Sequence, residues 1–253
     1  MIRYELSGKT ALITGGASGI GFATAAMLGR NGAKVAINHL ADDPRGAESV
    51  AQLRGLGIDA VAAPGNVGVA GEAERMVTDA VTALGRLDLL VANAGTPGTR
   101  RKIEPHELDL ITEELWRAVV EVNLIGVFRC ARAAAPALRA SRGAIVSTAS
   151  IAGLGVPGSS LAYGATKAGV INMTQNLARA LGPDVRVNAV APGAVDSTWM
   201  VEWSDEQRRA SIEGATLKRR CTTDDIAEVI TFLGFGAAMV TGQTIVVDGG
   251  LTL

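Results

Sequence analysis

The chain has 253 residues, of which 48% are hydrophobic and 19% charged, with a formal net charge of −1 at pH 7. This composition indicates a compact folded protein and argues against nonspecific binding to nucleic acid or to an anionic membrane surface. Two cysteines without metal-ligand spacing and only two histidines favour a reducing cytoplasm and predict no metal site. We expect no membrane span, because no apolar run is long enough, and no signal peptide at residues 1–5.

The first predicted elements form a strand, a glycine-rich turn and a helix. Residues 9–14 are typical of a short buried strand, residues 15–21 have the spacing Gly-x-x-x-Gly-x-Gly, and a helix follows to about Asn31. Bare amides and the helix dipole at such a helix start favour an anion, and glycines let a pyrophosphate approach closely. The alternative is a merely tight turn. We expect dinucleotide binding here.

The second predicted strand, residues 34–38, leads to the position that distinguishes NAD from NADP. An acidic side chain there binds the ribose hydroxyls of NAD, and a basic one binds the 2′-phosphate of NADP. This chain has His39, followed a little later by Asp42 and Arg45. Asp42 could reach a ribose and Arg45 or His39 a phosphate, while a solvated loop is an equal alternative. The cofactor choice therefore stays open.

Two further units of helix and strand are predicted over residues 44–63 and 71–91. The loop after the first places Asn66 where it could reach an adenine edge. The second ends at residues 93–95, Asn-Ala-Gly, whose small side chains would let a flat ring lie against the strand ends. Taken alone, the second motif is more simply interpreted as an ordinary turn.

The next stretch combines a basic loop with a long helix. Residues 96–102 include Arg100, Arg101 and Lys102, which form either an anion-attracting lip over the site or, more simply, a solvated loop. A helix with apolar periodicity is predicted over residues 112–138, with Asn123 inside it. Burying an amide costs free energy unless it is hydrogen-bonded. Asn123 is therefore either a buried structural contact or part of a site.

The segment from Ser150 to Lys167 carries the strongest chemical signal. A predicted strand at residues 143–149 ends at Ser150, and the following helix carries Tyr163 and Lys167, which leave the same helix face because they are four residues apart. An ammonium beside a phenol stabilises the phenolate, and a tyrosine whose pKa falls below about 10 can exchange a proton with an alcohol. Ser150 could bring a hydroxyl to the same point. Taken alone, the pair could also be an exposed contact on an ordinary helix.

The last third of the chain contains two more predicted strands, residues 185–191 and 244–248, and a helix over residues 223–232. The first of these strands leads into Pro192-Gly193. The segment 194–214 holds three large side chains, which suit either a lid over an apolar substrate or an oligomer contact: Trp199, Met200 and Trp203.

Strands and helices alternate throughout, and the strands are apolar without clean alternation. This pattern is typical of a parallel sheet covered on both faces. We therefore predict one α/β domain over residues 1–253, built on a doubly wound parallel sheet of about seven strands, with a substrate lid around residues 194–214. In open sheets of this kind ligands bind at the carboxyl ends of the strands, where the candidate side chains gather.

These motifs, in this order, resemble those of the short-chain dehydrogenases/reductases. The resemblance extends from Gly8 to Gly250 and rests on a shared set of motifs: the turn at residues 14–21, residues 93–95, Asn123, Ser150, Tyr163-x-x-x-Lys167, Pro192-Gly193 and residues 241–250. It implies a Rossmann-type fold and an NAD(P)-dependent oxidoreductase that interconverts a secondary alcohol and a ketone. It also implies a homotetramer that acts on a small-molecule substrate.

The resemblance implies a role for each catalytic residue. Tyr163 would be the general acid/base, Lys167 would lower its pKa and hold the nicotinamide ribose, Ser150 would bind the substrate oxygen, and Asn123 would hold a water. The nicotinamide would carry the hydride chemistry. The implied cofactor-binding residues are Gly15, Ser18, Gly19, Ile20, Gly21, His39, Asn66, Val67, Asn93, Ala94, Gly95, Tyr163, Lys167, Pro192, Gly193, Val195 and Ser197.

The chain departs from the family pattern at several points. Asn66 stands where the family usually has Asp, and His39 stands where NAD users have Asp. NADP users often carry arginine at the position of Ser18 or His39. The cofactor is therefore expected to be NAD or NADP without a choice between them. Residues 96–107 are also somewhat longer than expected, and residues 234–240 about one residue shorter.

Two other functions remain as alternatives. A 3-oxoacyl thioester reductase could use the basic residues 100–102 to attract an acidic acyl carrier protein. A non-catalytic dinucleotide sensor would need the fold and the glycine turn but not Ser150, Tyr163 and Lys167, which are all present. The sensor is therefore the weakest of the three.

Overall fold

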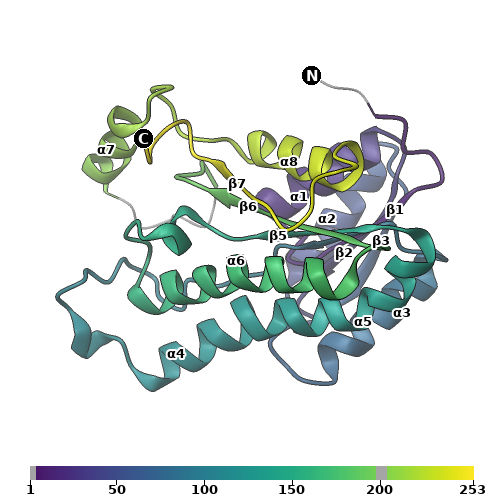
Figure 1. The fold of residues 1–253 in the computed structure, drawn as a ribbon, viewed down its shortest axis with the longest axis horizontal. Coiled ribbons are helices and arrows are strands. Elements are labelled where there is room, and N and C mark those ends of the chain that lie inside the picture. Colours follow the sequence, from purple (N-terminus) through teal and green to yellow (C-terminus); the bar gives the residue numbers. More distant parts are fainter. Residues whose placement is uncertain (1–3, 198–203) are drawn as a thin grey trace.

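A computed structural model describes residues 4–197 and 204–253. These residues form one parallel sheet of seven strands in the order β3-β2-β1-β4-β5-β6-β7 (Figure 1). The strands are β1 (Thr10–Ile13), β2 (Lys34–His39), β3 (Ala60–Pro64), β4 (Leu89–Ala92), β5 (Ala144–Thr148), β6 (Arg186–Pro192) and β7 (Thr244–Val247). The strand order reverses direction between β1 and β4, which is where open sheets of this class bind their ligands.

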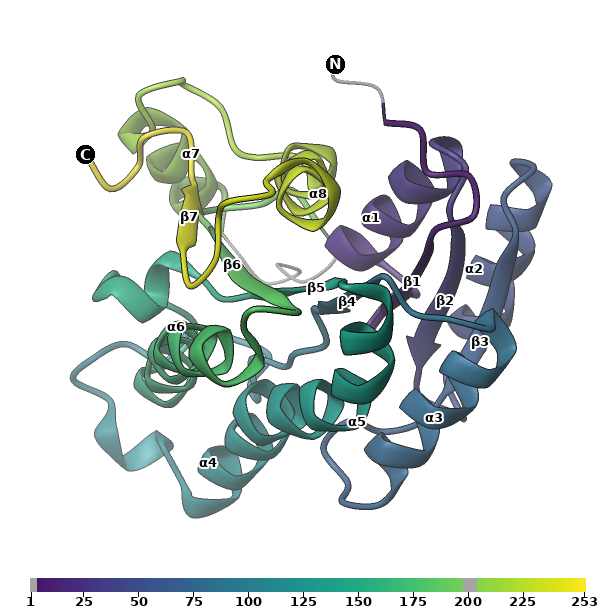
Figure 2. The same cartoon turned by 45° about the vertical axis from the view of Figure 1, so that its right-hand side comes forward.

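Helices cover both faces of the sheet, as the sequence predicts (Figure 2). They are α1 (Gly19–Arg30), α2 (Pro44–Gly55), α3 (Glu72–Leu84), α4 (Glu113–Val120), α5 (Gly126–Ser141), α6 (Leu161–Leu181), α7 (Asp205–Gly214) and α8 (Thr223–Thr231). One face carries α1, α2 and α8, and the other carries α3, α5 and α6. Although α1 and α8 lie near opposite ends of the chain, they pack side by side.

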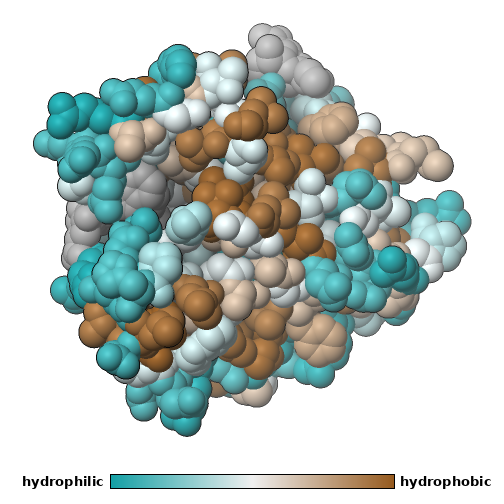
Figure 3. Space-filling view, turned by 60° about the vertical axis from the view of Figure 1, so that its left-hand side comes forward, coloured by the Kyte–Doolittle hydropathy of each residue, from teal (hydrophilic) through white to brown (hydrophobic). Residues whose placement is uncertain are grey.

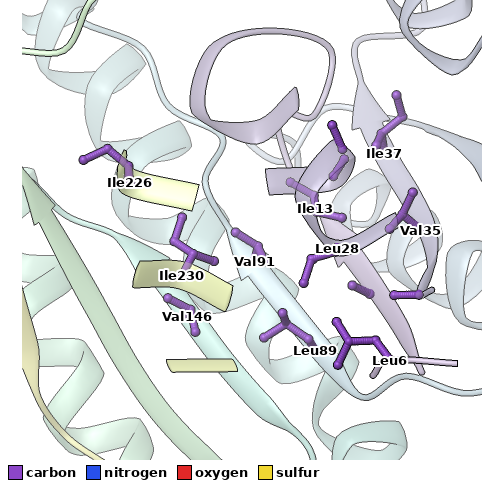
Figure 4. Close-up of a cluster of buried hydrophobic side chains, with 14 of the residues drawn as sticks. Leu6, Ile13, Leu28, Val35, Ile37, Leu89, Val91, Val146, Ile226 and Ile230 are labelled. Carbon is purple, nitrogen blue, oxygen red and sulfur yellow. The ribbon is translucent and has the colours of Figure 1, made fainter. Parts of the chain in front are cut away.

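The core consists of hydrophobic clusters on the two faces of the sheet. Successive side chains of a strand point to opposite faces, so Leu12 enters the cluster under α3 and α5 while Ile13 enters the cluster under α1 and α8. Figure 4 shows Ile13 of β1, Val91 of β4 and Ile230 of α8 in the cluster under α1 and α8. Burial on both faces explains why the strands are almost continuously apolar in sequence.

The long helix predicted over residues 112–138 is interrupted. It consists of α4, a single π-helical turn at Glu121–Ile125, and α5. A π-turn contains one residue more than an α-turn, and such turns often occur at functional sites. Asn123 lies in this turn, so the interruption falls on the residue that the sequence singles out.

The segment expected to be an irregular lid is partly helical. Residues 205–214 form α7, whose N-terminus is capped by Ser204, because the Ser204 hydroxyl accepts from the Gln207 amide and Gln207 Oε1 accepts from the Ser204 amide. The apparent lack of regular signals in this stretch concealed a short polar helix. Within the described residues, 4–197 and 204–253, no helix combines the length and apolarity that a bilayer crossing requires.

Candidate active site

The glycine turn between β1 and α1 leaves an open space at the start of the helix. Gly15 and Gly19 have φ angles of +61° and +55°, in the region that favours glycine. Among residues 4–197 and 204–253, a Cβ atom built on Gly19 would meet only the Cβ of Ser197, 3.9 Å away. Because α1 begins at Gly19, the amides of its first turn have no partners within the helix. The turn therefore fits the pyrophosphate of a dinucleotide.

Asn38, at the end of β2, holds this turn in place. Its Oδ1 accepts from the Gly15 amide at 3.2 Å, and its Nδ2 donates to the carbonyl oxygens of Ala63 and Gly65 at 3.0 and 2.8 Å. The side chain is 3% exposed, so it ties β2, β3 and the glycine turn together inside the protein. No sequence motif indicated this role, because the contacts depend on strands that are distant in the chain.

Asn93 is engaged in a similar way at the end of β4. Its amide nitrogen Nδ2 donates to the carbonyl oxygen of Thr14 at 3.1 Å, and its Oδ1 accepts from the Thr148 hydroxyl at 3.2 Å. The Thr14 hydroxyl accepts from the backbone amides of Asn93 and Ala94, both at 2.9 Å. These bonds fix the position of residues 93–95 at the carboxyl ends of β1, β4 and β5. Thr14 and Thr148 were not predicted.

Ser150 and Tyr163 come together at the carboxyl end of β5. Ser150 precedes a short 3₁₀ turn at Ile151–Leu154, and its hydroxyl accepts from the Ala152 amide at 3.1 Å. Ser160 caps α6 by accepting from the Tyr163 amide at 3.1 Å, which places Tyr163 in the first turn of that helix. The side chains of Ser150 and Tyr163 are hydrogen-bonded to each other.

Lys167 lies one helical turn beyond Tyr163 and is 4% exposed. Its Nζ donates to the carbonyl oxygen of Thr148 at 2.6 Å and lies 5.6 Å from the centroid of the Tyr163 ring. A Cβ on Gly153 would lie 2.6 Å from the carbonyl carbon of Lys167, so only glycine lets the 3₁₀ turn pack this closely on α6. The structure thus brings Ser150, Tyr163 and Lys167 together as predicted.

Burial, rather than the neighbouring ammonium, dominates the protonation of this group. Burial raises the pKa of Tyr163 to about 12, against the lowering effect of its hydrogen bond with Ser150. Burial also lowers the pKa of Lys167 to about 8. The sequence led us to expect a pKa below the ordinary value for Tyr163, and this expectation is wrong, because burial raises the pKa instead. At neutral pH the phenol holds its proton and is a hydrogen-bond donor.

Asn123 makes the buried contact that the sequence offered as one of two alternatives. Its Oδ1 accepts from the Thr96 amide at 2.7 Å, and its Nδ2 donates to the Thr96 carbonyl oxygen at 2.8 Å and to the Thr166 hydroxyl at 3.4 Å. The side chain has no exposed surface. Asn123 therefore joins the loop that follows β4 to the catalytic helix α6, between Tyr163 and Lys167. Its role in holding a water remains a prediction.

Of the three side chains proposed to choose between NAD and NADP, His39 and Arg45 have hydrogen-bond partners in the protein, and Asp42 is exposed. His39 Nδ1 lies 2.8 Å from the Leu40 carbonyl oxygen, and the imidazole packs against α2, where a Cβ on Gly46 would lie 2.2 Å from Nδ1. Arg45 donates to the Asp43 carboxylate through Nη2 at 2.7 Å and through Nε at 2.9 and 3.1 Å. This hydrogen bonding lowers the pKa of Asp43. The Arg45 guanidinium, which could bind a 2′-phosphate, is therefore already bound to Asp43.

Asn66 and Val67 follow β3 at the same edge of the sheet. Asn66 Oδ1 accepts from the Gly68 amide at 2.9 Å, and its backbone amide donates to Glu72 at 2.8 Å. Val67 is 5% exposed and packs into the cluster under α3 and α5. The fixed turn leaves the Asn66 amide group and the backbone of Val67 as the parts that could contact an adenine.

The basic lip that the sequence suggested is largely neutralised. Arg101 forms an ion pair with Glu107 at 3.1 Å, and Lys102 forms one with Glu104 at 3.1 Å. The same loop is fixed to the catalytic region, since the Ile103 amide donates to the Ser159 carbonyl oxygen at 2.8 Å.

The segment after β6 returns towards the glycine turn. The Gly193 amide donates to the Val247 carbonyl oxygen at 3.0 Å, Val195 pairs with Cys221 in a parallel bridge, and Ser197 reaches the space above Gly19. The predicted substrate residues Trp199, Met200 and Trp203 lie outside the described residues. Of the residues that the structure does describe, no three of the His, Cys, Asp or Glu type are placed to hold a metal ion.

Comparisons with known proteins agree with this geometry. The family model described as enoyl-(acyl carrier protein) reductase matches residues 15–252. The chain is 38% identical over 247 residues to a 3-oxoacyl-[acyl-carrier-protein] reductase, FabG, of Staphylococcus aureus, with 96% of this chain and 98% of the relative covered.

Two solved structures extend the comparison to bound cofactors. A short-chain dehydrogenase from Burkholderia cenocepacia in complex with NADP has a TM-score of 0.88 and 34% identity, covering 98% of this chain and 100% of its own. A 3-oxoacyl-[acyl-carrier protein] reductase from Brucella melitensis with bound NAD has a TM-score of 0.87 and 32% identity, covering 99% and 94%.

The fold, the site and these relatives define the class of protein. The chain belongs to the short-chain dehydrogenase/reductase family. It is an NAD(P)-dependent oxidoreductase with a Rossmann-type fold, and its cofactor is NAD or NADP. The fold class, the family and the type of cofactor predicted from the sequence are thus confirmed.

Proposed function

We propose that this enzyme interconverts a secondary alcohol and a ketone, with Tyr163 as general acid/base. The observation that carries this proposal is the meeting of three groups at one point: the Ser150 hydroxyl bonded to the Tyr163 phenol, and the Lys167 ammonium 5.6 Å from the phenol ring. The glycine turn that fits a pyrophosphate lies at the same edge of the sheet. A substrate and a dinucleotide can therefore meet there.

Each residue has a distinct task in ketone reduction. Ser150 donates a hydrogen bond to the carbonyl oxygen, and Tyr163, protonated at neutral pH, transfers its proton to that oxygen as negative charge develops there. The Lys167 ammonium stabilises the phenolate that remains, and its bond to the Thr148 carbonyl oxygen fixes its position. The bound nicotinamide supplies the hydride in this direction and accepts it in the reverse.

Specific groups of this chain would hold the cofactor. The amides at Gly19 and Ile20 would bind the pyrophosphate, Asn66 and Val67 the adenine, and Lys167 the nicotinamide ribose. Residues 193–197 would border the nicotinamide. Support comes from Gly19, the glycine of the turn at which a built Cβ meets no described atom closer than 3.9 Å.

The direct test is a panel of small and bulky ketones assayed with both NADH and NADPH. We expect turnover with one or both nucleotides and a preference among the ketones. A folded protein that binds the nucleotides but reduces none of the ketones would contradict the proposal.

A second function is favoured by the 38% identity to the Staphylococcus aureus 3-oxoacyl-[acyl-carrier-protein] reductase. In that reading the substrate is a 3-oxoacyl thioester on an acidic carrier protein. The ion pairs of Arg101 and Lys102 reduce the positive charge that the loop offers to such a carrier. The two functions are separated by comparing kcat/KM for a 3-oxoacyl carrier protein with that for the same acyl group on a short free thioester.

We further propose that the enzyme is a cytoplasmic homotetramer. Ile245 and Val246 on the edge strand β7 are 36% and 39% exposed, and Leu253 near this edge is fully exposed. Figure 3 shows hydrophobic side chains gathered over the middle of the face it presents. An open strand edge with apolar side chains favours pairing with a second copy. Light scattering showing a monomer would contradict the assembly.

The cysteines support the cytoplasmic location. Both are buried and unpaired, as suits a reducing compartment.

A further inference from the structure

Arg220 is a buried cation that none of the sequence motifs includes. It precedes α8, and its side chain is only 5% exposed. The chain on either side of it runs beside the end of β6: the Cys221 amide donates to the Ala194 carbonyl oxygen at 3.0 Å, and the Asp196 amide donates to the Cys221 carbonyl oxygen at 2.8 Å. Arg220 thus lies against the segment that continues from Pro192-Gly193.

The guanidinium binds two successive residues of that segment. Nη2 donates to the Val195 carbonyl oxygen at 2.8 Å, and Nη1 forms an ion pair with Asp196 Oδ1 at 2.8 Å. The planar fork of arginine can hold a carbonyl and a carboxylate at once in a fixed relative orientation, which a lysine cannot do. A buried charge is tolerated only when it is paired and hydrogen-bonded, so these contacts are a requirement of burying Arg220.

The residue that follows this contact lies over the dinucleotide turn. Ser197 comes directly after Asp196, and of the atoms that the structure describes its Cβ is the nearest to the position that a Cβ on Gly19 would take, at 3.9 Å. A cavity of about 340 Å³ opens here and is lined by residues of both sides, among them Ser18, Gly19, Ser197 and Thr223. The contacts of Arg220 with residues 195 and 196 therefore determine the distance between residue 197 and the glycine turn.

We propose that Arg220 is a positioning residue for the nicotinamide half of the cofactor. It fixes the distance between residues 194–197 and the glycine turn. Arg220 acts through its contacts with Val195 and Asp196 and does not itself contact the cofactor. The inference rests on the proposed function, because it takes residues 193–197 to border the nicotinamide. The adenosine half, bound at the β2 and β3 ends of the sheet, should be independent of Arg220.

The test compares a whole dinucleotide with half of one. Equilibrium binding of NADH, NADPH and AMP, which lacks the second phosphate and the nicotinamide half, is measured by calorimetry for the wild type, Arg220→Met and Arg220→Lys. For Arg220→Met we expect tenfold or greater weakening of the preferred dinucleotide with AMP binding changed less than twofold. Arg220→Lys keeps the positive charge but not the planar guanidinium that binds two acceptors at once. We therefore expect its dinucleotide affinity to lie between those of the wild type and Arg220→Met. In turnover, KM for the cofactor should rise with a smaller change in kcat.

Arg219→Met is the matched control. Arg219 is the adjacent arginine and also forms an ion pair, with Asp225 at 2.6 Å, but that pair lies at the start of α8 and its side chain is 54% exposed. Its dinucleotide affinity should stay within twofold of the wild type. Asp196→Asn provides a second test if Arg220→Met does not fold, because Asp196 is 63% exposed and the substitution replaces the ion pair with Arg220 by a neutral hydrogen bond. It should weaken the dinucleotide and not AMP.

The outcomes separate this inference from the function on which it rests. Unchanged dinucleotide affinity in folded Arg220→Met or in Asp196→Asn overturns the role of Arg220 and leaves the proposed function standing. Equal weakening of AMP and dinucleotide also overturns it, because the effect would then be on the whole fold. A wild-type chain that binds neither AMP nor a dinucleotide overturns the proposed function, and this inference with it.

Discussion

Lys167 Nζ donates a hydrogen bond of 2.6 Å to the carbonyl oxygen of Thr148, the residue that ends β5 two positions before Ser150. The Thr148 carbonyl thus fixes the Lys167 ammonium to β5, the strand that also leads to Ser150. The same burial lowers the pKa of Lys167 from 10.5 to about 8. A cation held in this way is poised to lose its proton just above neutral pH.

The first prediction concerns stability and pH. Because the pKa of Lys167 is lower in the folded protein, the unfolded chain binds more protons between about pH 8 and 10.5, and Lys167 makes the protein more stable as pH rises through that window. Cys130 has the opposite effect above pH 9, since burial raises its pKa to about 12. The stability difference between the wild type and Lys167→Met isolates the lysine. We expect it to grow in favour of the wild type by about 3 kcal/mol between pH 7.5 and 10.5 in urea unfolding. A pH-independent difference would contradict the buried ammonium.

The second prediction concerns the acid. Tyr163→Phe removes the proton that we assign to the substrate oxygen, so turnover should fall by about a thousandfold or more. Cofactor affinity, measured by nicotinamide fluorescence, should stay close to that of the wild type. Tyr4 is the other tyrosine of the chain, and Tyr4→Phe should keep full turnover. A Tyr163→Phe enzyme within tenfold of the wild-type kcat would remove Tyr163 from the chemistry.

The third prediction concerns the glycine turn. Among the described residues a Cβ on Gly19 meets no atom closer than 3.9 Å, so Gly19→Val should fold, with a cost of roughly 1–3 kcal/mol for its left-handed backbone, and should no longer bind a dinucleotide. Gly57 is a matched control, because it also has a positive φ, of +78°, and a Cβ there would meet no described atom within 4 Å. Gly57→Val should lose similar stability in urea unfolding and keep normal binding. Normal NAD(P) affinity in a folded Gly19→Val would show that the pyrophosphate lies elsewhere.

The fourth prediction concerns the choice of cofactor. Asp43→Asn keeps an oxygen to cap α2 but removes the charge that holds Arg45, which frees the guanidinium for a 2′-phosphate. We expect the ratio of NADPH to NADH affinity to rise by about tenfold, one strong hydrogen bond to a charged group being worth roughly 1.5 kcal/mol or more. The double variant with Arg45→Gln should return the ratio to its wild-type value. If it does not, Arg45 is not the group that Asp43 restrains.

Local signals in the sequence sufficed for the strands, for the glycine turn and for the expectation that Ser150, Tyr163 and Lys167 lie together. Continuous apolar runs such as residues 10–13 and 89–92 correctly indicated strands buried on both faces. The spacing of Tyr163 and Lys167 put both on one side of α6.

Contacts between distant segments were not predictable in this way. Asn38 looked like the end of an ordinary strand, and its role appeared only when β3 and the glycine turn came beside it. The pKa of Tyr163 was misjudged because the spacing to Lys167 says nothing about burial, which outweighs the neighbouring charge. The π-turn at Asn123 was also missed, because apolar periodicity continues across it.

The two hydrogen bonds between Asn123 and Thr96 involve only the backbone amide and carbonyl of Thr96. Any residue except proline at position 96 can therefore make them, and the loop that begins there can change its sequence without losing these two bonds. Other contacts of this segment are specific: the Ile103 amide bonds the Ser159 carbonyl oxygen, and Leu115 and Val119 of α4 share a buried cluster with Ala162 of α6. Loops of other members of the family could therefore be grafted between residue 97 and α4 to alter substrate range, provided that these contacts beside Tyr163 are kept.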